Sequence, residues 1–136
     1  MITAVDTNVL LDVFGADPIY GARSAQALRD CIAAGSLIAC DVVWAETSAS
    51  FARPKEAEAA LARLRIDFCS FDSATSLAVG RRWRAYRKAG GSRERVIADF
   101  MIGAHALANA DRLLTRDRGF YRRYFEHLRV LDPSGD

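Results

Sequence analysis

The stretch ITAVDTNVLLDVF, residues 2–14, contains a pattern that the rest of the chain repeats. Its short apolar run, 2–5, predicts a buried strand, and residues 9–14 follow with a helical pattern. Asp6 ends the strand. In open α/β sheets, ligands bind at the carboxyl ends of the strands. The stretch therefore predicts one strand–helix unit with a candidate functional carboxylate between its two elements.

The same alternation continues to the end of the chain. Further strands are predicted over residues 37–40, 66–71, 113–115 and 128–131. One helix is predicted to begin at Pro18 and to end at Gly35. Asp41 and Asp72 are predicted N-caps of helices over 42–51 and 73–88. Further helices are predicted over 54–64, 95–110 and 121–125. Because parallel strands need helical crossovers, we expect a three-layer α/β/α sandwich around a mostly parallel sheet.

Length and composition limit the classes of protein to consider. The 136 residues suffice for one compact domain, which we take as residues 1–136, and 51% hydrophobic with 26% charged residues is typical of a globular chain. The three cysteines have no C-x-x-C spacing, which argues against a zinc site. Apolar stretches are interrupted well before 18 residues. We expect a cytoplasmic protein that does not associate with membranes.

Acidic residues follow two of the predicted strands. Asp6 comes directly after the first strand and Asp117 comes two residues after the strand 113–115, with the polar Asn8 and Thr115 close to them. Both carboxylates are therefore candidates for a site at the strand ends. The alternative is purely structural, with Asp6 as a helix N-cap and Asp117 as a turn residue.

Two further acids stand in apolar surroundings. Asp99 lies in VIADFMIGAHALA, where a buried carboxylate would need compensation, for which a metal ion is suited. Glu46 is the only acid in VVWAETSASF. The structural alternatives are an Asp stabilised at a helix N-terminus and a solvated Glu. The other acids have polar or basic neighbours and are expected on the surface: Asp12, Asp17, Asp30, Glu56, Glu58, Asp67 and Glu126.

Four carboxylates from four elements suit a hard divalent cation. Mg²⁺ or Mn²⁺ prefers carboxylate oxygens and water and leaves coordination positions for phosphate oxygens. Such a site activates water and stabilises charge on a phosphodiester. We therefore expect Asp6, Glu46, Asp99 and Asp117 to be both the metal ligands and the catalytic residues.

Arginines are frequent near the predicted site. Arg exceeds Lys in the segment 81–95 and around Asp117, and arginine makes bidentate contacts with phosphate. The alternative is a solvated helix face. Candidate contacts with an RNA backbone are Arg93, Arg112, Arg116 and Arg118.

The ordered set of motifs resembles the PIN-domain ribonucleases, and in particular the VapC-type toxins of bacterial toxin–antitoxin pairs. The matching stretches are VDTNVLLDVF, VVWAETSASF, VIADFMIGAHALANA and LLTRDRGFYRRYF. The resemblance implies a sheet of order 3-2-1-4-5 and one metal pocket lined by the four acids. It also implies that Asn8 and Thr115 are the polar residues that support this pocket. It also implies an RNA substrate, a homodimer, and a cognate VapB-type antitoxin with which the toxin forms a hetero-oligomer.

Two alternatives to a metal-dependent endoribonuclease stay open. One is a module that binds RNA or an antitoxin without cutting. The other is a phosphatase with Asp6 as the nucleophile, although Asn8 stands where such enzymes place a second Asp and no lysine partner is evident.

Overall fold

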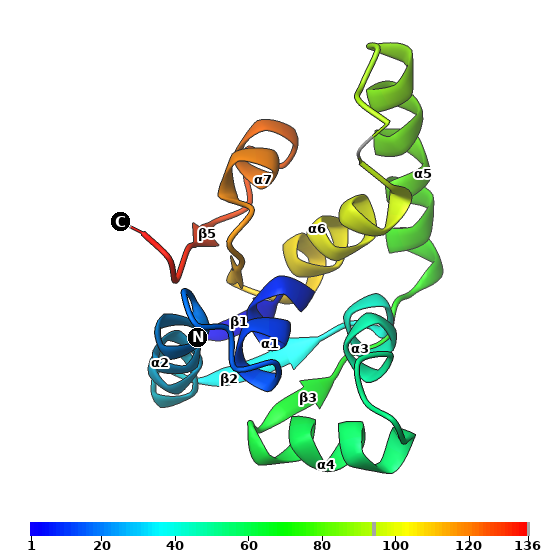
Figure 1. Ribbon diagram of the computed structural model, residues 1–136. Helices are drawn as coiled ribbons and strands as arrows, with labels where there is room; N and C mark the ends of the chain where they lie inside the picture. The colour runs from blue at the N-terminus through cyan, green and yellow to red at the C-terminus, as the bar shows by residue number, and fades with distance from the viewer. Residues whose placement is uncertain (94, 136) are drawn as a thin grey trace.

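The computed structural model describes residues 1–93 and 95–135, and it consists of strands that alternate with helices (Figure 1). The described strands are β1 (Ile2–Val5), β2 (Ser36–Ala39), β3 (Ile66–Phe68), β4 (Arg112–Leu114) and β5 (Val130–Leu131). They form one parallel sheet in the order β3-β2-β1-β4-β5. This finding confirms the expected parallel sheet and the strand order that the resemblance implies.

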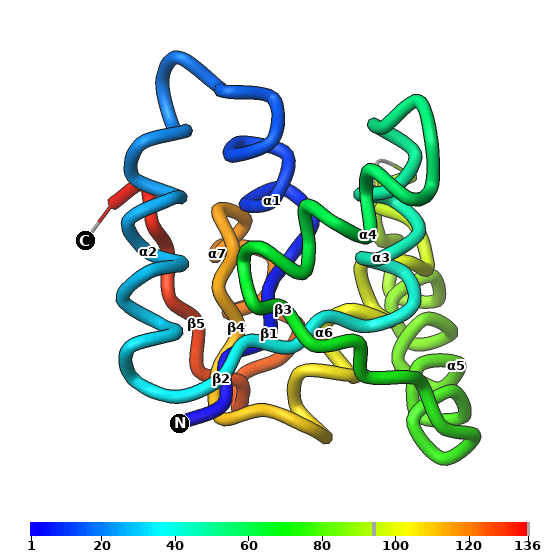
Figure 2. Tube along the Cα trace, turned by 90° about the horizontal axis from the view of Figure 1, so that it is seen from below, coloured from blue at the N-terminus to red at the C-terminus, as the bar shows by residue number. Residues whose placement is uncertain are grey.

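Helices cover both faces of the sheet. They are α1 (Thr7–Phe14), α2 (Gly21–Ala33), α3 (Asp41–Ser48), α4 (Pro54–Arg63), α5 (Ser73–Lys88), α6 (Ile97–Asn109) and α7 (Arg118–Tyr124). Seen along the sheet, α2 lies on one side, and α5 and α6 lie on the other (Figure 2). The three-layer sandwich is therefore confirmed. Within the described ranges, no helix combines the length and the apolar character that crossing a bilayer requires.

The register of the central strands brings distant polar residues together. Val5 of β1 is aligned with Leu114 of β4. The next residue, Asp6, donates its backbone N–H to the Leu114 carbonyl at 2.9 Å. As a result, Asp6 and Thr115 leave the sheet side by side at its carboxyl edge, although 109 positions separate them.

An aromatic cluster fixes α6 against its neighbours. The Phe100 ring, which is 1% exposed, lies at the centre of this cluster. Its centroid is 5.2–5.9 Å from those of five rings on α5, α7 and the segment after α7: Trp83, Tyr86, Phe120, Tyr124 and Phe125. Burying so many rings stabilises the packing of these elements. The cluster therefore holds Asp99, next to Phe100, and Asp117, just before α7, in a fixed relation.

Two predicted helix starts are wrong. Pro18 does not open a helix, because the Asp17 carboxylate accepts the N–H groups of Ile19 and Tyr20 at 2.9 and 2.8 Å and holds a turn, so that α2 begins at Gly21. Asp41 is the first residue of α3 and not its N-cap. Its carboxylate instead accepts the N–H of Phe71 at 2.7 Å.

Most remaining differences concern element ends. α1 begins earlier than expected, at Thr7, and α6 begins later, at Ile97. The C-cap of α2 is Ala34 and not Gly35. Asp72 is the N-cap of α5, as predicted, and accepts the N–H of Thr75 at 2.7 Å.

Two helical glycines give a matched test of the packing around Phe100. A Cβ on Gly103 of α6 would lie 2.6 Å from the Phe125 ring, whereas a Cβ on Gly80 of α5 would meet nothing within 4 Å. We expect Gly103→Ala to lower the free energy of unfolding by about 1–3 kcal/mol through overpacking. Gly80→Ala should raise it by about 0.5–1 kcal/mol, since alanine is the better helix former. Urea unfolding measures both, and a Gly103→Ala protein as stable as wild type would contradict the packing described.

Candidate functional site

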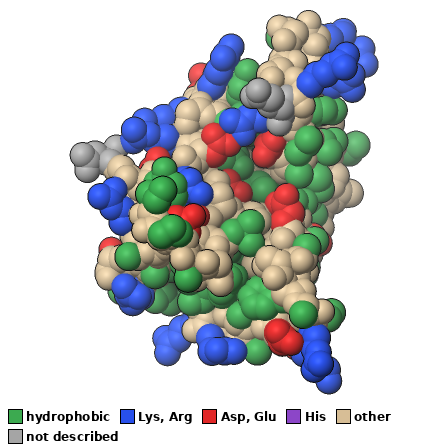
Figure 3. Space-filling view, viewed as in Figure 1, with side chains coloured by type: hydrophobic (Ala, Val, Ile, Leu, Met, Phe, Trp, Pro, Cys, Tyr) green, Lys and Arg blue, Asp and Glu red, His purple; other side chains and the backbone are tan. Residues whose placement is uncertain are grey.

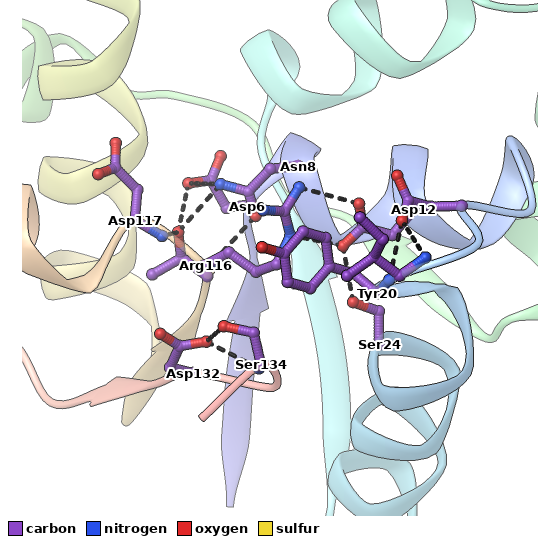
Figure 4. A network of polar contacts seen from close by, with 12 residues as sticks. Asp6, Asn8, Asp12, Tyr20, Ser24, Arg116, Asp117, Asp132 and Ser134 are labelled. Carbon is purple, nitrogen blue, oxygen red and sulfur yellow. Dashed lines mark hydrogen bonds and ion pairs between the residues drawn. The ribbon is translucent and has the colours of Figure 1, made fainter. Parts of the chain in front are cut away.

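Asp6 lies at the carboxyl edge of the sheet, between β1 and α1, close to Asn8 (Figure 4). It is 6% exposed and is the N-cap of α1, with Oδ1 accepting the Thr7 N–H at 2.7 Å. Its Oδ2 accepts from the Thr115 hydroxyl at 2.8 Å, from the Tyr121 hydroxyl at 3.2 Å and from the Asn8 amide at 3.3 Å. Asp6 is therefore a helix N-cap, as the structural alternative proposed. Capping requires only the bond from Thr7, so it does not explain the other three donors.

Burial dominates the protonation of Asp6. The pKa of its carboxyl is raised from 3.8 to about 6. Removal from water is the largest cause, the hydrogen bonds from Thr115, Thr7 and Tyr121 act in the opposite direction, and the negative charge of Asp99 contributes to the rise. Near neutral pH the carboxylate is ionised but poorly solvated. A cation beside it would relieve this cost.

Asn8 and Thr115, the expected supporting residues, link the strand ends. The Asn8 amide donates to Thr115 Oγ1 at 3.3 Å, and its Oδ1 accepts the Arg116 N–H at 3.1 Å. Thr115 Oγ1 also accepts the Asp117 N–H at 3.0 Å. These bonds fix the chain after β4 against the first turn of α1.

Asp99 lies in the first turn of α6. Its carboxylate accepts the Val96 N–H at 3.1 Å, and the residue is half-buried. The expectation of a carboxylate enclosed by apolar neighbours is therefore wrong, because the helix begins two residues later than predicted and exposes its first turn. Asp99 still lies near the site, since its charge contributes to the raised pKa of both Asp6 and Tyr121.

Tyr121 is a site residue that the sequence did not reveal. Its hydroxyl is buried against Asp6, and its pKa is raised mainly by burial and then by the charges of Asp6, Asp99 and Asp117. The charges of three aspartates therefore act on one phenol, and Asp6 is hydrogen-bonded to it. In the sequence, Tyr121 is one of several aromatic residues near arginines, and no local pattern distinguishes it from the others.

Glu46 joins the site through Thr7. The Thr7 hydroxyl donates to Glu46 Oε1 at 2.8 Å, and the Thr7 N–H donates to Asp6. Glu46 itself is exposed on α3. The solvated-Glu alternative describes its exposure, while the contact with Thr7 places it at the edge of the acidic cluster.

Asp117 has a charged partner that the sequence did not indicate. Arg95 donates Nη1 to Asp117 Oδ2 and Nη2 to Oδ1, the second bond at 3.1 Å. The Arg95 guanidinium also lies over the Phe120 ring, 4.3 Å from its centroid. The pair with Asp117 raises the pKa of Arg95, and Asp99 contributes. The Asp117 carboxylate consequently points away from Asp6 (Figure 4).

The donor set has the right chemistry for Mg²⁺ or Mn²⁺, but its arrangement is incomplete. Carboxylate oxygens are the ligands that these ions prefer. Acidic side chains gather near the centre of one face, with basic side chains around them (Figure 3). Yet among residues 1–93 and 95–135, no three acidic, His or Cys side chains are close enough together to hold one ion. The four predicted ligands are neighbours without forming a closed site in this conformation.

Three of the four arginines expected to contact RNA have partners within the protein. Arg116 forms a two-bonded ion pair with Asp12, at 2.7 and 3.0 Å, and Arg118 lies 3.6 Å from Asp132. Arg112 donates to the Thr3 hydroxyl at 2.9 Å. Arg93 is exposed, and its contact with RNA stays a prediction.

The prediction that Asp12 lies on the surface is wrong. The residue is 3% exposed, because its carboxylate accepts the Ser24 hydroxyl at 2.8 Å as well as the Arg116 guanidinium. The Arg116 guanidinium in turn lies 4.0 Å from the Tyr20 ring centroid. This buried pair ties α1 to the segment after β4.

Comparison with known proteins identifies one family profile and several similar structures. Residues 3–126 match the model of the PIN domain. No curated protein matches the chain. A chain of VapBC2 from Rickettsia felis bound to a promoter DNA fragment is 18% identical with a TM-score of 0.75, and the match covers 97% of this chain and 98% of that one.

Two further structures are similar. A chain of VapBC-1 from nontypeable Haemophilus influenzae is 19% identical with a TM-score of 0.75, covering 99% of this chain and 100% of that one. A chain of FitAcB from Neisseria gonorrhoeae is 22% identical with a TM-score of 0.67, covering 98% of each. At these identities the likeness concerns the fold.

The raised pKa of Asp6 predicts a pH-dependent stability in EDTA. The folded protein holds this proton more tightly than the unfolded chain, so the contribution to stability is full below about pH 4 and is lost as the pH rises through about 6. The change amounts to about 3 kcal/mol, at about 1.4 kcal/mol per unit of pKa. Relative to wild type, Asp6→Asn should therefore gain stability between pH 4 and pH 7 in urea unfolding.

Asp17→Asn is a control of opposite sign. Backbone N–H bonds lower the pKa of Asp17, so its ionised form stabilises the folded protein above the unfolded pKa. The Asp17→Asn protein should lose stability relative to wild type over the same pH range. A difference between Asp6→Asn and wild type that is independent of pH would contradict the desolvation of Asp6.

Proposed function

Because the chain belongs to the PIN domain family, we propose that it is a metal-dependent endoribonuclease that acts as the toxin of a toxin–antitoxin pair. The observation that carries the proposal is the link between Asp6 and Asp117 at the carboxyl edge of the sheet: the Thr115 hydroxyl donates to the Asp6 carboxylate and accepts the Asp117 N–H. Its proposed substrate is an RNA phosphodiester, and its proposed partner is a cognate VapB-type antitoxin. The similar structures named VapBC support the partner.

The proposed ligands of Mg²⁺ or Mn²⁺ are Asp6, Glu46, Asp99 and Asp117. When bound, a divalent cation supplies positive charge to the phosphodiester and lowers the pKa of a water molecule. Asp6 is the most strongly oriented of the four, because Thr7, Asn8, Thr115 and Tyr121 all donate to it. These residues hold the carboxylate in one position and exclude water from it.

Asp99 and Glu46 are less strongly held by hydrogen bonds than Asp6. Among the described residues, Asp99 accepts one hydrogen bond, from the Val96 N–H, and Glu46 accepts one, from the Thr7 hydroxyl. Carboxylates with so few hydrogen bonds can turn toward a ligand at little cost, and Glu46 is exposed while Asp99 is half-buried. The proposed site therefore combines one rigid carboxylate with others that adjust.

A module that binds RNA or an antitoxin without cutting is the second candidate. The ion pair between Arg95 and Asp117 favours this binding module, because the pair neutralises the charge of one proposed metal ligand. The phosphatase alternative has less support. The two lysines of the chain, Lys55 and Lys88, belong to the start of α4 and the end of α5, whereas Asp6 follows β1.

Asp99→Asn tests cleavage without disturbing the fold. Asparagine can still accept the Val96 N–H, so α6 should keep its first turn. Removal of one charged ligand should lower the rate of cleavage of total RNA with Mn²⁺ by at least about a hundredfold. The rate is measured from the loss of full-length RNA on denaturing gels.

Asp67→Asn, an exposed acid on β3, is the matched control and should cleave at the wild-type rate. Cleavage that survives Asp99→Asn, or that persists in excess EDTA, would contradict the metal-dependent mechanism. RNA that binds wild-type protein in a mobility shift but is never cut would favour the binding module.

A further inference from the structure

The ion pair between Arg95 and Asp117 occupies the place where a cation would be expected. Both oxygens of the Asp117 carboxylate accept from the guanidinium, so the charge of Asp117 is already paired with a cation. Arg95 is also close enough to Asp99 for their charges to interact. One positive charge of the chain itself therefore lies beside two proposed metal ligands.

The surroundings of Arg95 stabilise this position without enclosing it. Its guanidinium lies on the Phe120 ring, 4.3 Å from the centroid, a contact that favours a cation there. The side chains of Arg95 and Asp117 are 30% and 34% exposed. An ion pair with this exposure is weak and exchanges readily, in contrast to a buried one.

We propose that Arg95 is an internal competitor for the metal, whose guanidinium neutralises Asp117 in the metal-free protein and must leave before a divalent cation binds there. The inference rests on the proposed function, because it takes Asp117 to be a metal ligand. It makes Arg95 a residue that sets the affinity of the site for its metal.

The structure provides space for the displaced side chain. A cavity of about 460 Å³ adjoins Arg95 and is lined on its other sides by residues that include Gly91, Gly119 and Tyr124. This cavity is the space into which the guanidinium could move when it leaves Asp117. Once released, it would be available to a phosphate near the site.

Calorimetric titration with MnCl₂, in the absence of RNA, tests the proposal. Arg95→Met keeps the length of the side chain and removes its charge. It should bind Mn²⁺ roughly fivefold more tightly than wild type, which is the factor that a partly exposed ion pair is worth. Arg29→Met removes the same charge from an exposed position on α2 and should change the affinity by less than about twofold at 0.15 M salt.

Asp117→Asn separates competition at Asp117 from a general effect of charge. In that background Arg95→Met should give a smaller gain in Mn²⁺ affinity, because the contested ligand is gone and only the interaction of Arg95 with the charge of Asp99 remains. Equal Mn²⁺ affinity of wild type and Arg95→Met would overturn the proposal, as would an equal gain in both backgrounds. A lower melting temperature with unchanged Mn²⁺ affinity would overturn it too, and would make the pair purely structural.

These outcomes differ from failure of the proposed function. If wild-type protein cleaves RNA with Mn²⁺ and Arg95→Met shows no gain in affinity, only the role of Arg95 fails. If neither protein binds Mn²⁺ and wild type does not cleave, the nuclease proposal fails with it.

Discussion

The carboxylate of Asp6, held almost out of water at the end of the central strand, is the constraint on which the site depends. Burial of a charge is costly unless donors or a counter-ion compensate for it. Here four donors come from α1, from the residue after β4 and from α7. Satisfying one side chain thus requires three elements to meet at one edge of the sheet, and it places the other acids around that edge.

Pairing between arginine and aspartate is a second recurring feature. Arg95 with Asp117, Arg116 with Asp12, and Arg118 with Asp132 each join segments that are distant in the sequence. The nearly balanced total charge of +2 therefore conceals internal neutralisation. The pairs differ in burial, since Asp12 is 3% exposed whereas the side chain of Asp117 is 34% exposed. Only the more exposed pair is suited to exchange its partner.

Local patterns predicted the elements well, because the signals for them are local. Each strand was found from a short apolar run, and the cap at Asp72 follows from a bond to a residue three positions away. Asp41 misled the prediction because its carboxylate binds the N–H of Phe71, thirty positions away. Asp12 misled it for the same reason, since its partner Arg116 is 104 positions away.

The site shows the same division between local and distant signals. Asp6 and Asp117 stand next to strands, so their placement at the sheet edge was predictable. Tyr121 and Arg95 belong to the site through contacts across 115 and 22 positions, and nothing in their neighbouring residues distinguishes them from core or surface. A resemblance between motifs predicts which acids share one site, but the hydrogen-bond and ion-pair partners of those acids can be identified only from the structure.

A crystal soaked in MnCl₂ and measured at the manganese absorption edge tests the central claim most directly. The account predicts an anomalous peak between Asp6, Asp99 and Asp117, with the Arg95 guanidinium turned away from Asp117. A peak elsewhere, or no peak at saturating Mn²⁺ with Arg95 still bonded to Asp117, would contradict it.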